Sequence, residues 1–204
     1  MTKAAEKTLR VAEISRTTKE TDVLVRINLD QPGECDIETS LPFLSHMLNA
    51  LACHARFSLM VRATGDIEVD PHHLIEDTGI VLGESIFKAL GGLSGIQRAG
   101  CFSYPMDGTL ASVAIDLCGR RNLTWHAEFS NFCIGNLDPN LFREFYKGFV
   151  DGLRATLHVN LQYRDNDHHA VEAIFKATAR ALKEAVVRLD DGATLSTKGM
   201  LDES

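Results

Sequence analysis

A short motif, H-H-x-x-E, occurs twice in this chain of 204 residues, and no other feature constrains the fold as much. The copies occupy residues 72–76 and 168–172, so they begin 96 positions apart. Each copy opens a run in which apolar residues recur at the spacing of an amphipathic helix. A repeat of roughly a hundred residues indicates a duplicated unit the size of a small domain, since solenoid repeats are much shorter.

The segments that precede the two motifs also correspond. In each half the pattern predicts a helix and then a strand, over residues 42–54 and 57–63 in the first half and over 140–153 and 155–161 in the second. Arg56 and Arg154 occupy matching positions at an offset of 98, and at that offset His46 falls opposite Glu144. Each half therefore offers one further potential ligand from its earlier helix.

Strand patterns fill much of the remaining chain. Val23, Val25 and Ile27 alternate with other residues, and two more strands are predicted over 110–117 and 122–129. The order in each half predicts an α+β fold of two fused, duplicated modules, each a sheet with helices packed on one face. We place the boundary near residues 93–98, which divides a single domain into two pseudo-repeats of about 1–95 and 96–204.

The duplicated motif is typical of a paired metal site. Histidine and glutamate four residues apart project from the same face of a helix, whereas adjacent histidines point about 100° apart. Mixed imidazole and carboxylate ligands without thiolate suit Mn²⁺, Fe²⁺ or Zn²⁺, and open octahedral positions favour Mn²⁺ over a closed structural zinc site. Eight groups, four for each of two ions, are then predicted ligands: His46, His72, His73, Glu76, Glu144, His168, His169 and Glu172.

The composition argues against several other classes of protein. The net charge is −7 and no basic stripe with aromatic residues occurs, so nucleic acid is not an expected partner. No apolar run approaches the length of a membrane span, and the N-terminal residues lack the apolar region of a secretory signal. The five cysteines are scattered and odd in number, which predicts reduced thiols in a cytoplasmic protein.

Eight segments, in order over nearly the whole chain, together resemble the imidazoleglycerol-phosphate dehydratase family of histidine biosynthesis. The segments are residues 16–21, 42–48, 65–77, 95–98, 105–107, 116–120, 168–177 and 196–199. The resemblance implies a ribosomal protein S5 domain 2-like fold, two Mn²⁺ ions per active site, and a homo-oligomer of 24 subunits in which ligands come from different subunits. The implied reaction is a dehydration of D-erythro-imidazole-glycerol phosphate to imidazole-acetol phosphate through a metal-bound imidazolate.

The resemblance also implies roles for individual residues. The carbon-bound proton of the substrate is not acidic by itself, so a positioned carboxylate must move it. Glu20 resembles the acid/base residue of the family, and Glu172 would be a catalytic carboxylate as well as a ligand. The substrate phosphate requires cations and hydrogen-bond donors. The residues that resemble this phosphate clamp are Arg98, Arg120, Lys176, Ser196 and Lys198.

The chain departs from the usual family pattern at several positions. Aspartate, glutamine, glycine, glutamate, serine and glycine are usual where this chain has Ser45, Ala50, Ala55, Gly108, Cys118 and Arg164, respectively. Ala50 and Gly108 matter most, because hydrogen bonds lost around a metal site cost 10–100-fold in affinity or activity. Two alternatives stay open beside an active dehydratase: a non-catalytic metal-binding assembly of the same fold and a dinuclear metallohydrolase.

Overall fold

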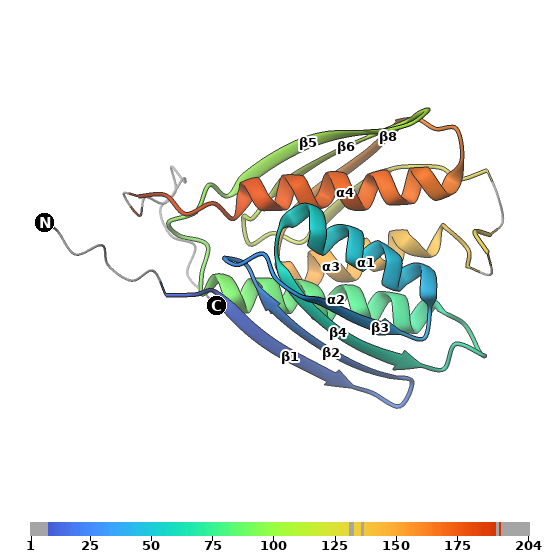
Figure 1. Cartoon of the computed structure of the whole chain (residues 1–204), viewed down its shortest axis with the longest axis horizontal. Coiled ribbons are helices and arrows are strands. Elements are labelled where there is room, and N and C mark those ends of the chain that lie inside the picture. The colour runs from blue at the N-terminus through green and yellow to red at the C-terminus, as the bar shows by residue number, and fades with distance from the viewer. Residues whose placement is uncertain (1–7, 131–132, 136, 191, 193–204) are drawn as a thin grey trace, which may run out of the picture.

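Four helices lie between two four-stranded sheets (Figure 1). The structure is a computed structural model, and it describes residues 8–130, 133–135, 137–190 and 192. The apolar faces of both sheets and of the helices meet in the space between the sheets, where the core side chains are almost wholly buried. The predicted fold class is confirmed, because each sheet carries its helices on one face.

The first sheet is built from residues of the first half of the chain. Its strands are β1 (Val11–Thr17), β2 (Thr21–Asn28), β3 (Cys35–Thr39) and β4 (Ser58–Gly65). They are arranged in the order β1-β2-β4-β3, with β3 parallel to β4 and the other pairs antiparallel. Val23, Val25 and Ile27 all point into the core, as their alternation predicts.

The second sheet repeats this topology. Its strands are β5 (Ala99–Met106), β6 (Thr109–Asp116), β7 (Asn122–His126) and β8 (Thr156–Tyr163). The order is β5-β6-β8-β7, and again only the last pair is parallel. The helices are α1 (Pro42–Ala55), α2 (His72–Leu90), α3 (Leu141–Leu153) and α4 (Asp167–Ala185).

The duplication predicted from the motifs is therefore visible in the topology. Each half runs through two strands in a hairpin, a third strand, a helix, a fourth strand and a helix. Arg56 and Arg154, which match in sequence, end α1 and α3 with the same left-handed backbone, at φ of 58° and 56°. The predicted boundary at residues 93–98 falls between α2 and β5, and the division into pseudo-repeats of 1–95 and 96–204 stays a prediction.

Four strands differ from the predictions. The predicted strand over residues 122–129 ends at His126, and just beyond its end the carbonyl of Ala127 accepts a hydrogen bond of 3.0 Å from the Trp125 indole Nε1–H. The other three, β1, β3 and β5, were not predicted. Each lies at a sheet edge and has at most one buried residue, so no buried face marks it in the sequence.

Helices from different halves pack against each other, α1 on α4 and α2 on α3. The crossing of α2 and α3 is very close, because glycines face the backbone of the partner helix. A Cβ built on Gly79 would lie 2.2 Å from the carbonyl oxygen of Phe145, and one on Gly148 would lie 2.5 Å from that of Glu76. No described helix is long and apolar enough to cross a membrane.

Candidate metal centre

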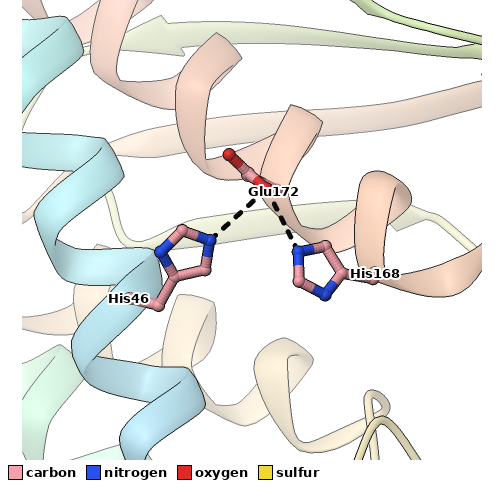
Figure 2. A group of neighbouring side chains, drawn as sticks. All are labelled: His46, His168 and Glu172. Carbon is pink, nitrogen blue, oxygen red and sulfur yellow. Dashed lines mark ion pairs between the residues drawn. The ribbon is translucent and has the colours of Figure 1, made fainter.

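One candidate metal centre lies where α1 meets α4. The sticks in Figure 2 show His46 on α1 and His168 and Glu172 on α4 pointing toward one another. One carboxylate oxygen of Glu172 lies 3.5 Å from Nε2 of His46 and 3.3 Å from Nε2 of His168. The two imidazoles are about half exposed, whereas the glutamate side chain is only 9% exposed, so the group opens toward solvent from a buried carboxylate.

Glu172 is held as an anion despite its burial. Burial by itself raises the pKa of a carboxyl group. The hydrogen bond from the Lys176 ammonium, 2.8 Å away, and the neighbouring positive charges outweigh this and hold the pKa of Glu172 below its usual value. The carboxylate therefore brings a negative charge to the point where the two imidazoles converge.

A second centre lies where α2 meets α3. It consists of His72 and Glu76 on α2 and Glu144 on α3, and in both centres the ligand atoms lie within 4.8 Å of one another. Nε2 of His72 is 3.7 Å from a Glu76 carboxylate oxygen, and Lys147 contacts both oxygens of Glu144 at 2.7 and 2.8 Å. The glycines at the crossing of α2 and α3 bring these side chains together.

The two centres are related by the internal duplication. His46 on α1 corresponds to Glu144 on α3, and His168 and Glu172 on α4 correspond to His72 and Glu76 on α2. Each centre therefore combines one helix from each half of the chain. The nitrogen and oxygen donors, with no thiolate, fit a divalent cation such as Mn²⁺, Fe²⁺ or Zn²⁺.

The second histidine of each motif lies outside both three-residue groups. Nδ1 of His73 is 3.3 Å from Asp66 and 3.8 Å from Glu20, and the hydrogen bond with Asp66 raises the pKa of the histidine. Nδ1 of His169 is 3.1 Å from Asp165. Of the eight predicted ligands, six are thus gathered in two groups of three, while His73 and His169 face carboxylates instead.

The predicted phosphate clamp is only partly assembled within one chain. Lys176 lies beside the first centre through its ion pair with Glu172. Arg98 donates two hydrogen bonds to Asp116, at 2.7 and 3.1 Å, and its backbone N–H donates to the carbonyl of Ala185 at the far end of α4. Ala185 is about 14 Å from Lys176 along the helix axis at 1.5 Å per residue.

Of the remaining clamp residues, the structure describes only Arg120. Arg120 is exposed, and its carbonyl accepts a hydrogen bond of 3.4 Å from the hydroxyl of Thr156, on the sheet. Ser196 and Lys198 lie outside the described residues. Within one chain, then, only Lys176 of the predicted clamp adjoins a metal centre among the residues that the structure describes.

Three of the departures from the family pattern have a visible structural setting. The hydroxyl of Ser45 bonds to the N–H and the hydroxyl of Thr39, at 3.1 and 2.9 Å, which fastens α1 to β3. Arg164 forms an ion pair of 2.8 Å with the buried Asp167, the first residue of α4. Gly108 leaves room for Asp165, as described below. Nothing in the structure explains Ala50.

The sequence analysis missed the carboxylates that face His73 and His169, namely Asp66, Asp107 and Asp165. Their positions in the chain could have identified them. Asp66 and Asp165 lie just ahead of the two motifs, a few residues from a predicted ligand. Asp107 lies in the hairpin of the second half, one residue before Gly108, which is the counterpart of Glu20.

The model of the imidazoleglycerol-phosphate dehydratase family matches residues 39–182, a span that contains both motifs and all six clustered residues. The chain belongs to the imidazoleglycerol-phosphate dehydratase family. This confirms the family that the sequence motifs resemble, and the predicted fold class agrees with solved structures of imidazoleglycerol-phosphate dehydratases.

Curated relatives and solved structures align with nearly their full lengths. The imidazoleglycerol-phosphate dehydratase of Geobacter sulfurreducens is 49% identical over 194 residues, covering 94% of this chain and 99% of its own. That of Methanosarcina mazei is 47% identical over 193 residues, covering 95% and 100%. The crystal structure from Staphylococcus aureus has a TM-score of 0.79 at 35% identity, covering 87% of this chain and 99% of its own. The structure from Pyrococcus furiosus, in complex with (S)-C348, has a TM-score of 0.81 at 34% identity, covering 92% and 100%.

Proposed function

We propose that this chain is a hydro-lyase that removes water from D-erythro-imidazole-glycerol phosphate to give imidazole-acetol phosphate, a step of histidine biosynthesis. The proposal depends on one observation. This chain, a member of the family, has two three-residue centres, and each contains residues from one copy of the duplicated motif. The proposed setting is the cytoplasm, and the proposed cofactor is Mn²⁺, two ions per active site.

We also propose that the active site forms between copies of the chain in a homo-oligomer of 24 subunits. Three observations support this. Each centre offers three ligands, the second histidines point elsewhere, and Arg98 is far from Lys176 along α4. A neighbouring copy that supplied His73 or His169 would give each ion a fourth ligand and would leave two of six coordination positions open for substrate.

The reaction requires one carbon-bound proton to leave and one hydroxyl group to depart as water, after which an enol becomes the ketone. Bound cations would supply electrostatic stabilisation of negative charge on the azole ring. Glu20 accepts and returns the proton; its side chain is 55% exposed and lies beside His73, at a rim that substrate reaches from solvent. Glu172, an ionised and buried carboxylate, would hold one of these cations.

The clamp residues bind the phosphate group and thereby orient the substrate. The phosphate group itself stays on the product. Lys176 is a cation next to Glu172, and Arg98, Arg120, Ser196 and Lys198 are the further proposed donors. A retained phosphate separates this proposal from a dinuclear metallohydrolase, which would use a bound water as nucleophile and release phosphate or another hydrolysis product.

The test is to incubate Mn²⁺-loaded protein with imidazole-glycerol phosphate and to follow the ketone product, free phosphate and bound metal together. We expect the ketone to form without release of phosphate. Release of phosphate would indicate the metallohydrolase. Binding of both metal and substrate without any product would leave the non-catalytic metal-binding assembly as the function.

A further inference from the structure

The two histidines outside the metal centres are held in the same way. Asp66 lies 3.3 Å from Nδ1 of His73, and both carboxylate oxygens of Asp165 lie 3.1 Å from Nδ1 of His169. An ionised carboxylate accepts hydrogen bonds and donates none, so Asp66 places a proton on Nδ1 of His73 and leaves Nε2 to bind a metal. In His169, Nε2 lies on the far side of the ring from Asp165, 3.7 Å from a carboxylate oxygen of Asp107.

Asp165 is itself firmly held. It accepts hydrogen bonds from the Thr109 hydroxyl at 2.7 Å and from the Asn166 backbone N–H at 2.8 Å. The Asn166 amide nitrogen, which only donates, lies 2.8 Å from Nδ1 of His169 and 3.2 Å from Asp165, so amide and carboxylate together hold this side of the ring. The Asn166 side-chain oxygen also caps α4 by accepting from the N–H of His169.

Strand register shows that Asp66 and Asp165 occupy equivalent positions in the two halves. Asp66 lies two residues beyond Thr64, which pairs with Asp22 on β2. Asp165 lies two residues beyond Tyr163, which pairs with the matching Leu110 on β6 after a register shift at that point. The same carboxylate has therefore been kept in both copies, even though the loops that follow it differ in length.

The halves differ at the neighbouring hairpin. Glu20 precedes Thr21 in the first half, and Gly108 precedes the matching Thr109 in the second. A Cβ on Gly108 would lie 2.9 Å from Cβ of Asp165, closer than real Cβ atoms approach. The second half thus has no glutamate in its hairpin, and Asp165 occupies the space beside the glycine.

We infer that Asp66 and Asp165 are positioning residues that fix the orientation of His73 and His169, so that Nε2 of each ring is the nitrogen presented to a metal. Because Gly108 has no side chain, it leaves room for Asp165. The inference rests on the proposed function, because it gives these histidines a metal to bind. Hydrogen bonds of this kind to a metal-binding histidine are worth 10–100-fold in metal affinity.

The test is calorimetric titration of the assembled, metal-free protein with Mn²⁺, carried out on Asp66→Ala, Asp165→Ala and Gly108→Ala. The matched control is Asp151→Ala, which removes an exposed aspartate paired with Arg121. We expect each of the three variants to lose about 10–100-fold in affinity at one class of site. The control should bind as the wild type does, and the melting temperatures should show that all variants fold.

Unchanged affinity in Asp66→Ala and Asp165→Ala, with normal binding by the wild type, would overturn the inference. A wild-type protein that binds no Mn²⁺ would instead contradict the proposed function, so the two failures are distinguishable. Gly108→Ala tests the packing around Asp165 without removing the charge of Asp165. It should weaken the same class of site as Asp165→Ala and leave the class affected by Asp66→Ala unchanged, and equal weakening of both classes would contradict the assigned role of Gly108.

Discussion

At the scale of single residues, the chemistry depends on where carboxylates stand relative to imidazoles. Glu172 is buried and ionised between two imidazoles and Lys176, which suits an ion ligand. Glu20 is exposed beside His73, which suits proton exchange with a bound substrate. The two glutamates should therefore respond differently to substitution.

Glu20→Gln should keep the metal content and lose at least about 100-fold in kcat, because the amide retains the shape of the side chain but cannot accept the proton. Metal analysis and steady-state kinetics on the same preparation check this. Asp22→Asn, an exposed change close to Glu20 on β2, is the control and should have normal kcat. Wild-type turnover by Glu20→Gln would assign the proton transfer to another residue.

Asp30 provides a pH test of the fold away from the metal centres. Burial raises the pKa of Asp30, but the hydrogen bonds from Arg10, at 2.6 to 3.0 Å, outweigh it and lower the pKa below the usual value. A lowered pKa stabilises the fold above the unfolded-state value of about 3.9, and this stabilisation is lost as pH falls through the folded-state value.

Asp30→Asn should therefore reduce the free energy of unfolding by about 1–3 kcal/mol at neutral pH. The difference from wild type should shrink as the pH falls below about 4. Urea unfolding at several pH values measures it, with the more exposed Asp36→Asn as a control. A difference that stays constant with pH would contradict the assignment.

At the scale of elements, the close crossing of α2 and α3 positions the second centre. Glycines on both helices let the backbones touch, and this brings Glu144 on α3 within reach of His72 and Glu76 on α2. The sequence has a G-x-x-x-G spacing at Gly79 and Gly83 and again at Gly148 and Gly152, and this spacing could have predicted the close crossing.

Gly79→Ala should destabilise the protein by about 1–3 kcal/mol through overpacking and should weaken metal binding at the second centre. The added Cβ would meet the Phe145 carbonyl oxygen at 2.2 Å, and backbone cannot move aside as a flexible side chain does. Denaturant unfolding and Mn²⁺ titration check both effects, with Lys88→Ala in the exposed last turn of α2 as the control. If Gly79→Ala is destabilised but binds Mn²⁺ normally, the close crossing of α2 and α3 does not position the second centre.

How far the sequence predicted these elements depended on periodicity. The helices that carry the motifs were predictable because their apolar residues repeat over several turns, and α2 begins at His72 as expected. The edge strands β1, β3 and β5 were not, since each buries at most one residue. Likewise, the motifs and the offset between the halves predicted the six clustered side chains as candidate ligands, whereas Asp66 and Asp165 depend on loop conformations that no short pattern encodes.

At the scale of the whole molecule, duplication explains the architecture of the site. Each centre takes one helix from each half, so neither half can build a centre alone. A single chain offers three candidate ligands in each group, and His73 and His169 are held by carboxylates elsewhere. The proposed sharing of ions between copies would link metal binding to assembly, because a bound ion would stabilise the assembled form by mass action.

Chelation of the metal should reduce the mass of the assembly, and addition of Mn²⁺ should restore it. Sedimentation velocity or light scattering checks this, with elemental analysis to prove that metal was removed. His54→Ala, outside both centres, should assemble normally. An unchanged mass in demonstrably metal-free protein would place the ions within single chains.

The most direct test of the central claim is anomalous diffraction at the manganese absorption edge from crystals grown with Mn²⁺. We expect two ions for each chain, and each ion should also bind an imidazole from another copy. One ion should be bound by His46, His168 and Glu172, and the other by His72, Glu76 and Glu144. Crystals grown in excess manganese that show these side chains apart, with no anomalous peak between them, would contradict the claim.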